Sequence, residues 1–329
     1  MSSLKDNDVG VLLINLGTPD APEPAAVRRY LAEFLSDPRV VEISKLIWQP
    51  ILRGIILRTR PAKSAEAYRQ VWTDEGSPLL AISKRQAARL RERFNDAIPV
   101  GLAMRYGSPS IGDELSRMVD QGLRKILLAP LYPQYCAATT ATAVDLVFSQ
   151  LAEMRDQPAI RTLPPYYDDP LYIGALKASI DRQLAALDFT PERLVLSFHG
   201  MPERTRQLGD PYHDQCQETA RLLAERIDLP VDIAFQSRFG RAKWLEPATD
   251  ATLAAYPAKG VKRIAIAAPG FSADCLETLE ELGIRGRETF LSAGGTHFAR
   301  LDCLNDSDEG MKMLDALIRR ELAGWWEAA

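Results

Sequence analysis

One histidine of the 329-residue chain stands where it could do chemistry. His199 directly follows the apolar run 194–198 and precedes a glycine. A neutral imidazole can ligate a divalent metal ion or accept a proton near neutral pH. The structural alternative is a buried ring that hydrogen-bonds to the backbone, and the pattern leaves both open. The other two histidines, His213 and His297, have no comparable setting, and we expect them at the surface or in loops.

Carboxylates are concentrated in residues 274–281. Glu277 and Glu281 are four residues apart, so on a helix they lie on one side, where like charges repel unless a cation or a proton relieves them. This spacing indicates a metal or proton route. The alternative is structural, because Asp274 could cap the helix and Glu277 could complete a capping box. The buried stripe of that helix would then consist of Leu276, Leu279 and Leu282.

Other polar and aromatic residues also follow apolar runs. They are Arg105 and Tyr106, the segment from Tyr132 to Tyr135, Ser237 and Arg238, and Phe271. In open α/β sheets, ligands bind beyond the carboxyl ends of the strands. Arginines pair with carboxylates, and aromatic faces pack against flat rings. Such a lining suits a large, partly anionic aromatic ligand.

Short apolar runs alternate with longer amphipathic segments along the chain, which is typical of an α/β fold with a parallel sheet. Each expected strand is mostly apolar, as in a sheet covered on both faces. These strands are Val9 to Leu16, Ile98 to Arg105, Lys125 to Leu131, Leu194 to Phe198, Val231 to Gln236 and Arg263 to Ala268. The expected helices include 80–94, 111–119, 212–227 and 307–322.

The strand endings of the two halves correspond. In order, each half has a strand that ends at a glycine, one followed by arginine, an aromatic residue and glycine, and one that ends in Ala-Pro. This predicts two similar Rossmann-like lobes with parallel sheets, although glycine is common in βα turns for conformational reasons alone. We place the boundary near the prolines at 164–170. The expected parts are an amino-terminal lobe (1–163), a carboxyl-terminal lobe (164–306) and a last helix (307–329) that packs back on the first lobe.

Composition and missing motifs exclude several classes of protein. Apolar residues make up 46% of the chain and the net charge is −4, so no basic footprint indicates nucleic acid as a partner. No dinucleotide-binding, P-loop or G-x-S-x-G motif is present. The four scattered cysteines read as reduced thiols, and residues 1–8 do not resemble a signal peptide. We therefore expect a cytoplasmic protein.

Residues 42–57 form an apolar segment that carries cations. Trp48 lies in it with Lys45 and Arg53, and Arg58 follows. A pair of core helices would explain this composition. The alternative is an apolar lip that holds a lipophilic ligand or rests on a membrane surface, with its cations facing lipid phosphates.

Motifs along nearly the whole chain resemble, in order, those of the ferrochelatases, which insert Fe²⁺ into porphyrins. They are VLLINLGTP at 11–19, Arg105-Tyr106, Tyr132-Pro133-Gln134-Tyr135, LSFHG at 196–200, Gly209-Asp210-Pro211-Tyr212, FQSRFG at 235–240, Trp244-Leu245 and PGFSADCLETLEE at 269–281. The resemblance implies two Rossmann-like lobes with an active-site cleft between them.

The resemblance also implies roles for individual residues. His199 and Glu277 resemble the facing histidine and carboxylate at which iron is ligated or pyrrole protons are accepted. Asp274 and Glu281 resemble the supporting acidic residues. Residues 42–57 resemble the lip of members that meet membranes. The residues that resemble the porphyrin pocket are Leu16, Arg105, Tyr106, Tyr132 and Trp244.

The expected reaction converts protoporphyrin IX and Fe²⁺ into protohaem with release of two protons, the last step of haem synthesis. The apolar segment favours protoporphyrin IX over coproporphyrin III, because protoporphyrin has fewer carboxylates. Open alternatives are a coproporphyrin ferrochelatase, a chelatase for Co²⁺ or Ni²⁺, and a non-catalytic tetrapyrrole carrier. We expect peripheral contact with the inner membrane and no permanently bound cofactor.

Two features depart from the pattern of some relatives. Cys275 stands where those relatives carry a second histidine, which puts a metal path through this position in doubt. Residues 322–329 contain no cysteine cluster, so no [2Fe–2S] centre is expected.

Overall fold

The computed structural model describes residues 8–238, 240 and 242–327. The described chain divides into two compact units. Unit 1 comprises Met1–Leu131, Ala137–Pro164 and Leu314–Ala329, and unit 2 comprises Tyr132–Cys136 and Pro165–Met313. The main segment of unit 2 thus begins between two adjacent prolines, Pro164 and Pro165. Phe239, part of the FQSRFG motif, lies outside the described residues.

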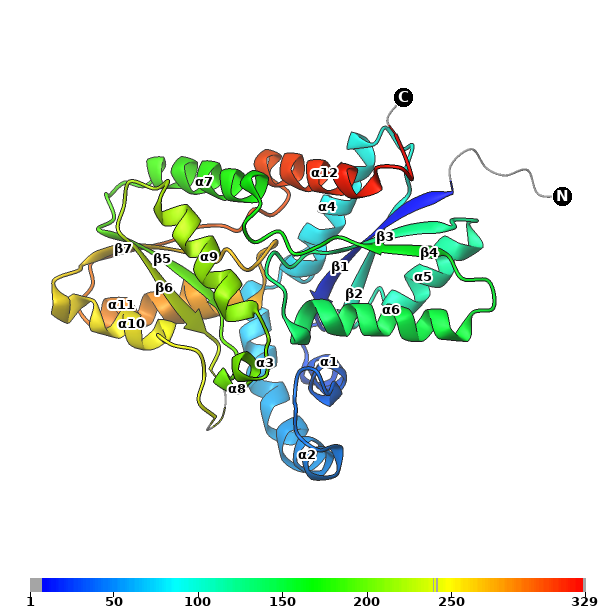
Figure 1. Ribbon diagram of the computed structural model, residues 1–329. Coiled ribbons are helices and arrows are strands. Elements are labelled where there is room, and N and C mark those ends of the chain that lie inside the picture. Colours follow the sequence, from blue (N-terminus) through cyan, green and yellow to red (C-terminus); the bar gives the residue numbers. More distant parts are fainter. Residues whose placement is uncertain (1–7, 239, 241, 328–329) are drawn as a thin grey trace. The chain divides into compact units, whose positions relative to one another are not determined.

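Unit 1 is built on a parallel sheet of four strands (Figure 1). These are β1 (Val9–Gly17), β2 (Val100–Tyr106), β3 (Lys125–Pro130) and β4 (Ala159–Thr162), in the spatial order β2-β1-β3-β4. The central strand β1 is buried over almost its whole length because helices cover both faces.

Unit 2 repeats this arrangement. Its strands are β5 (Arg193–His199), β6 (Val231–Gln236), β7 (Arg263–Ala267) and β8 (His297–Arg300), parallel and in the order β6-β5-β7-β8. The strand order of unit 2 therefore matches that of unit 1, which confirms the prediction of two similar Rossmann-like lobes with parallel sheets. The six predicted strands are all present. The short edge strands β4 and β8 were not predicted, because they are partly exposed and lack a continuous apolar run.

Helices connect the strands in both units. In unit 1 they are α1 (Pro24–Ser36), α2 (Lys45–Ile51), η1 (Leu52–Ile56), α3 (Leu57–Val71), α4 (Pro78–Arg93), α5 (Ile111–Asp120), η2 (Ala137–Ala141) and α6 (Thr142–Glu153). In unit 2 they are α7 (Pro170–Ala185), α8 (Glu203–Gln207), α9 (Tyr212–Ala224), α10 (Thr249–Ala255), η3 (Pro257–Lys259), η4 (Glu277–Gly286) and α11 (Arg287–Ser292). The last helix, α12 (Asp308–Leu322), begins in unit 2 and ends in unit 1. The segments η1, η2 and η4 are π-helical, a rare geometry that is frequent at functional sites.

Apolar side chains on the strands pack against the helices to form a core in each unit. In unit 1, Leu12, Ile126 and Leu128 pack with the buried stripes of α5 and α6. In unit 2, Val195, Ile264 and Ile266 pack with α10 and with Leu282 and Phe290. Burying side chains of this size contributes about 1.5–3 kcal/mol each, so these clusters hold the strand ends in place.

The end of the chain is fixed within unit 1. Phe94 lies edge-to-face with Trp326, and Arg319 donates to the Arg93 carbonyl at 2.7 Å. Arg161, on β4, stacks over the ring of Trp325 and donates to the carbonyl of Glu321. Cation–π and charge-assisted contacts of this kind tie the last helix to the edge strand.

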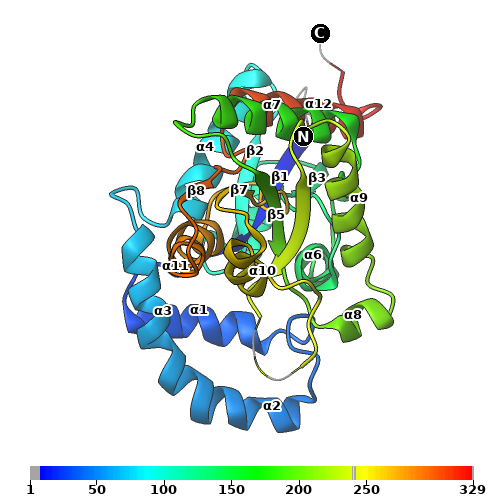
Figure 2. The ribbon, with the colours of Figure 1, turned by 90° about the vertical axis from the view of Figure 1, so that its left-hand side faces the viewer.

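Helices α1, α2 and α3 form a projection of unit 1, with α2 as its outermost part in both views (Figure 2). Of the helices that the structure describes, none combines the length and the apolar character needed to cross a bilayer.

Candidate active site

His199 is the last residue of β5, at the carboxyl edge of the unit 2 sheet. Its Nδ1 lies 2.7 Å from the Gly200 carbonyl oxygen, which can only accept a hydrogen bond. Nδ1 therefore carries the proton, and Nε2 carries the lone pair. The hydrogen bond to the backbone fixes the tautomer of the neutral ring. The residue is only half-buried, so part of it remains accessible. A histidine held in this way is suited to ligate a metal ion or accept a proton.

The residue after His199 must be a glycine, because the backbone of β6 passes very close to this position. A Cβ atom at this position would lie 2.4 Å from the Gln236 carbonyl oxygen and 3.4 Å from the Trp244 indole. The Gly200 N–H donates to that same carbonyl at 2.7 Å. The glycine of the LSFHG motif is thus required by close packing, which holds the His199 end of β5 against the end of β6.

Glu277 is the first residue of the π-helix η4, and its side chain is partly exposed. Its main-chain carbonyl accepts a 3.0 Å hydrogen bond from Nε2 of Gln236, the residue paired with His199 in the sheet register. Gln236 therefore links the segments that carry His199 and Glu277. Sequence reasoning included Gln236 only within a motif. An amide side chain directly after an apolar run was the signal that could have identified it, because a buried amide needs hydrogen-bond partners.

Glu281 lies one turn along η4 and is held by Ser237. Its carboxylate accepts hydrogen bonds from the Ser237 N–H at 2.8 Å and the Ser237 hydroxyl at 2.6 Å. Arg285 lies 3.9 Å from the same carboxylate. These donors relieve the repulsion expected between Glu277 and Glu281 without a bound cation. Ser237 has φ +64°, a left-handed conformation that is strained for serine and that Glu281 stabilises.

Asp274 is buried and fully engaged. Its carboxylate pairs with Arg300 at 2.9 Å and accepts 2.7 Å hydrogen bonds from Thr278 and Asn305. Asp274 therefore fixes the loop before η4 to β8 and the segment that follows it. The Cys275 N–H is capped by the Thr278 hydroxyl at 3.0 Å. The predicted capping box of Asp274 and Glu277 is thus wrong.

The predicted buried stripe of this helix is also wrong in part. Of the three leucines expected there, only Leu282 is buried, and Leu276 and Leu279 are half-exposed. The π-helical i→i+5 pairing changes which side chains share a face. The buried residues of η4 are Thr278, Glu280, Leu282 and Gly286. Glu280 is tolerated there because Arg285 pairs with it at 2.8 Å.

In unit 1, Arg105 and Tyr106 end β2 and converge on Asp37. The Arg105 guanidinium pairs with the Asp37 carboxylate, stacks over the Tyr106 ring and donates to Thr142 at 2.7 Å. The fully buried Tyr106 donates its hydroxyl to Asp37 at 2.9 Å. Burial is the main cause that raises the pKa of Tyr106, so the phenol stays neutral. Sequence reasoning did not single out Asp37.

The pKa of Asp37 is lowered. Burial acts to raise it, but this effect is outweighed by hydrogen bonds from Thr142, the Arg39 N–H and Tyr106, and by the charge of Arg105. Asp37 is therefore ionised under ordinary conditions and holds Arg105 in place.

The remaining predicted pocket residues lie in three different segments. Leu16 is half-buried near the end of β1 in unit 1. Tyr132 is half-buried in the segment 132–136, which is tied to α9 by a 3.0 Å bond between Gln134 and Thr219. Trp244 is half-buried and bridges to Pro202, just beyond His199. Tyr132 and Trp244 therefore share unit 2 with His199.

His213 is a correction to the sequence analysis. It lies in the first turn of α9, with 14% of its side chain exposed, stacked on Phe235 and bonded to Asp214 at 2.9 Å. The residues around His213 form no apolar run, so the sequence did not indicate that its ring would be largely covered. His297, by contrast, is exposed at the start of β8.

No group of three or more His, Cys, Asp or Glu side chains with metal-site geometry occurs among the described residues. The four cysteines are free and buried, and burial raises the pKa of Cys216, Cys275 and Cys303. A two-residue site such as His199 and Glu277 would hold iron only transiently, which suits a metal that is a substrate.

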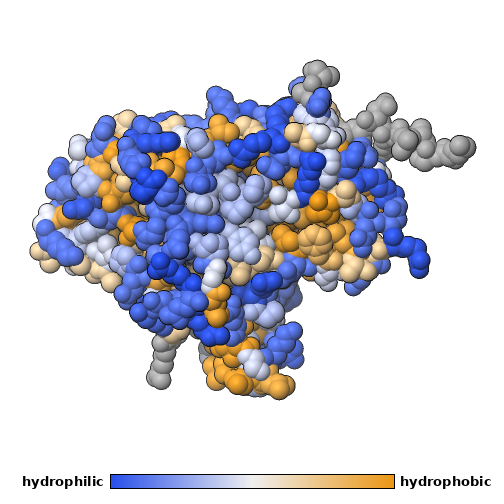
Figure 3. Space-filling model, viewed as in Figure 1, coloured by the Kyte–Doolittle hydropathy of each residue, from blue (hydrophilic) through white to orange (hydrophobic). Residues whose placement is uncertain are grey.

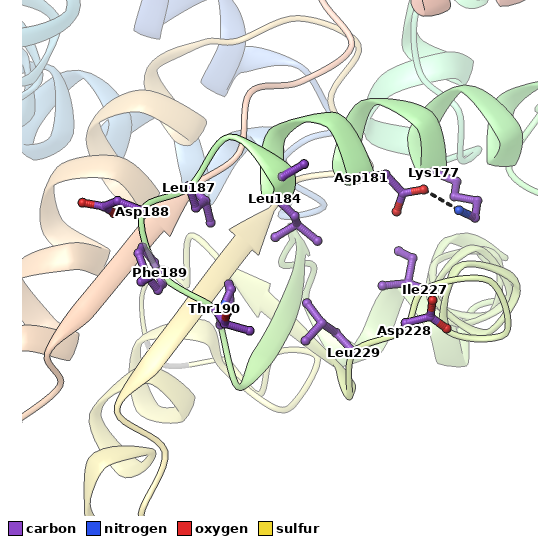
Figure 4. Close-up of a pocket in the computed structure, with 12 residues that line it drawn as sticks. Lys177, Asp181, Leu184, Leu187, Asp188, Phe189, Thr190, Ile227, Asp228 and Leu229 are labelled. Atoms are coloured by element: carbon purple, nitrogen blue, oxygen red, sulfur yellow. Dashed lines mark hydrogen bonds and ion pairs between the residues drawn. The ribbon is translucent and has the colours of Figure 1, made fainter.

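A pocket of about 590 Å³ in unit 2 lies away from these residues (Figure 4). Thr190 and Pro191 line it just before β5, and Asp228 and Leu229 just before β6, so it is at the amino ends of those strands. Parallel sheets bind their ligands at the carboxyl ends, where His199 lies. We therefore assign the chemistry to the His199 edge.

Comparisons with known proteins identify the family of the chain. The family model described as Ferrochelatase matches residues 8–322. The chain is 52% identical to a ferrochelatase of Rhizobium meliloti (strain 1021) over 324 residues, 96% of each chain. It is 50% identical to a ferrochelatase of Brucella canis (strain ATCC 23365 / NCTC 10854 / RM-666) over 331 residues, 98% of this chain and 94% of that one.

Among solved structures, SirB from Bacillus subtilis with Fe³⁺ matches with a TM-score of 0.56 and 12% identity, over 96% of both chains. A likeness at this identity supports the chelatase-like fold alone. The sequence matches go further, because they extend over nearly the whole chain at about half identity and include the segments of His199 and Glu277. The chain belongs to the ferrochelatase family and is an enzyme that inserts iron into a porphyrin in haem synthesis.

Proposed function

We propose that this ferrochelatase inserts Fe²⁺ into protoporphyrin IX, with His199 and Glu277 as the groups that receive the iron and the pyrrole protons. The observation that carries the proposal is the hydrogen bond between His199 Nδ1 and the Gly200 carbonyl. In the neutral imidazole this bond places the proton on Nδ1 and leaves the lone pair on Nε2. This is the state in which an imidazole can ligate Fe²⁺ or accept a proton.

Metallation requires two changes at the porphyrin centre. Two pyrrole N–H protons must leave, and Fe²⁺ must exchange its water ligands for the four ring nitrogens. A neutral imidazole and a carboxylate can ligate the ion weakly and can also accept protons. Glu277 is suited to this role because its side chain is partly exposed, whereas the carboxylates of Asp274 and Glu281 are held by Arg300 and by Ser237.

We assign contacts with the porphyrin ring and its propionates to Leu16, Arg105, Tyr132 and Trp244, with Tyr106 as a buried support. Asp37 keeps Arg105 charged and fixed, so that a porphyrin carboxylate meets an ordered guanidinium. Asp274 and Glu281 support Glu277 indirectly, by fixing the loop before η4 and the turn after β6.

Protoporphyrin IX is preferred over coproporphyrin III in this proposal because of the apolar segment at α2 and η1. Leu46 and Ile47 of α2 and Ile55 of η1 are 89%, 62% and 58% exposed. The space-filling view shows an apolar surface at the place of α2 in Figure 1 (Figure 3). Such a patch binds the less charged and more lipophilic porphyrin better. Comparison of turnover on the two porphyrins tests this preference, and faster turnover of coproporphyrin III would contradict it.

The same surface supports peripheral contact with the cytoplasmic face of a membrane. Lys45, Arg53 and Arg58 are exposed beside the apolar side chains, as in helices that lie in the interface of anionic lipid. The Trp48 ring is buried instead, with its indole N–H on the Leu35 carbonyl at 2.6 Å. The tryptophan thus anchors α2 to α1, and the aliphatic residues would face the lipid.

We also propose that no iron–sulfur cluster is bound, since the four cysteines are widely separated along the chain. Analysis of iron and acid-labile sulfide in the purified protein tests this, and stoichiometric sulfide would contradict it.

An anaerobic Fe²⁺-insertion assay with protoporphyrin IX tests the assigned groups. We expect H199A and E277A each to lose at least 100-fold in kcat while still binding porphyrin, because each removes a proton acceptor or iron ligand. H297A and E288A are matched controls, since both parent side chains are exposed elsewhere in unit 2. Equal activity of H199A and H297A would overturn the assignment. Porphyrin binding without metallation by the wild type would favour a carrier.

A further inference from the structure

We infer that the side chain of Gln236 is a positioning residue that sets the spacing between the strand end of His199 and the first turn of the Glu277 helix, an inference that rests on the proposed roles of those two residues. Gln236 ends β6 and is paired with His199 in the sheet register. Its side chain is buried, with 3% of the residue exposed. A side chain this inaccessible acts through its neighbours.

The amide of Gln236 has one possible orientation. Nε2 lies 3.0 Å from the Glu277 carbonyl oxygen, which can only accept, so the NH₂ group must face η4. Oε1 lies 2.8 Å from the Ser197 hydroxyl, which donates to it. The Thr249 hydroxyl, 2.8 Å from Ser197, then donates to Ser197 in turn. Three hydrogen bonds in series thus connect α10 through β5 and β6 to the start of η4.

The main chain of Gln236 holds the other catalytic segment. Its carbonyl oxygen accepts from the Gly200 N–H at 2.7 Å, and the Gly200 carbonyl accepts from His199 Nδ1 at 2.7 Å. One residue therefore contacts both the turn that orients the imidazole and the turn that carries the carboxylate. Reacting groups must be held to well within 1 Å of their productive positions. A link that sets the distance between His199 and Glu277 should therefore affect kcat more than the binding of porphyrin.

The next residue provides a second tie to the same helix. Ser237 binds the carboxylate of Glu281, one turn further along η4. Loss of the Gln236 amide should therefore not detach η4. It should instead release the first turn of η4 alone, which is where Glu277 lies.

Two substitutions test the role. Q236M keeps the volume but removes both side-chain hydrogen bonds. We expect it to lower kcat about tenfold and to change the KM for porphyrin less than twofold. The matched control is Y256F, which removes a 2.6 Å hydrogen bond to Asp232 at the amino end of the same strand. We expect Y256F to lose similar thermal stability and to keep full activity.

Q236E tests the hydrogen bond to Glu277 separately. A carboxylate in this place keeps the acceptor for Ser197 but sets two acceptors against each other at the Glu277 carbonyl. We therefore expect Q236E to lose kcat as Q236M does, with the KM for porphyrin changed less than twofold.

The outcomes are distinct. Equal losses of kcat in Q236M and Y256F, or wild-type kcat in Q236E, would overturn the positioning role while H199A and E277A remain inactive. An active H199A would instead remove the proposed function on which it rests. A loss of kcat in Q236M and Q236E but not in Y256F, with little change in KM, would establish it.

Discussion

The phenol of Tyr106 and the carboxylate of Asp37 form a buried hydrogen bond of 2.9 Å, and Arg105 pairs with the same carboxylate. Two adjacent residues at the end of β2 are thereby fixed by one acidic residue that follows α1. The arginine that we propose as a porphyrin contact is thus held in place by a carboxylate outside every motif that resembles the family.

Replacement of this carboxylate should destabilise unit 1. We expect D37N to lower the free energy of unfolding by about 2 to 4 kcal/mol, because it leaves Arg105 buried without its partner. D145N, at an exposed ion pair with Arg39, should cost less than about 1 kcal/mol. Urea unfolding of both variants measures the difference, and equal losses would contradict the assignment.

The same carboxylate predicts a pH dependence of stability. The pKa of Asp37 is lower in the folded protein than in the unfolded chain, so its contribution is complete above the unfolded pKa and is lost as the pH falls through the folded pKa. The stability difference between wild type and D37N should therefore shrink in acid. A difference that grows as the pH falls would show that the sign is wrong.

Ser237 allows strain and hydrogen bonding to be separated. S237A removes the hydroxyl bond to Glu281 and keeps a side chain at φ +64°, whereas S237G removes the same bond and relieves the strain. We expect S237A to cost about 1–2 kcal/mol and S237G to be more stable than S237A by about 0.5–1 kcal/mol. Thermal unfolding of the pair tests this, and the reverse order would exclude a strained serine.

Gly200 should tolerate no side chain. G200A places a Cβ 2.4 Å from the Gln236 carbonyl, so β5 and β6 must separate next to His199. We expect at least a tenfold loss of kcat and about 1–3 kcal/mol of stability. G174A, in the open interior of α7, is the matched control and should be stabilising by about 0.5–1 kcal/mol. Normal activity of G200A would disprove the close approach.

The exposed aliphatic residues of α2 should determine membrane contact. We expect the wild type to sediment with vesicles that contain anionic lipid, and the double variant L46E/I47E to bind at least tenfold more weakly. L208E introduces a carboxylate at another exposed leucine, in unit 2, and should bind like the wild type. Equal binding of L208E and the double variant would place the lipid contact elsewhere.

The sequence sufficed for the strands whose burial is continuous. Residues 9–16 and 194–198 lie in strands as predicted, because sheets covered on both faces require apolar runs. It did not suffice for β8, which is partly exposed and only four residues long. It also failed for the buried face of η4, since nothing in the residue types distinguishes a π-helix from an α-helix there.

The candidate site was predictable to a similar degree. His199 and Glu277 were identified from residue type, position and resemblance. The residues that hold Glu281 and Arg105 were not identified. Ser237 is brought to Glu281, and Asp37 to Arg105, only by tertiary packing. Charge spacing along the chain suggested repulsion between two glutamates, whereas Ser237, in the turn after β6, supplies donors to Glu281.

Each lobe has a glycine at the end of its central strand, where the backbone of the neighbouring strand comes very close. Gly17, at the end of β1, lies against the Tyr106 carbonyl, and Gly200, directly after β5, lies against the Gln236 carbonyl. The residue before the glycine is Leu16 in one lobe and His199 in the other. Corresponding close approaches of the backbone thus carry a hydrocarbon side chain in one lobe and an imidazole in the other. Single side chains thus distinguish two lobes of similar architecture. The variant L16H would test whether the position before Gly17 can also accept a proton or ligate a metal ion.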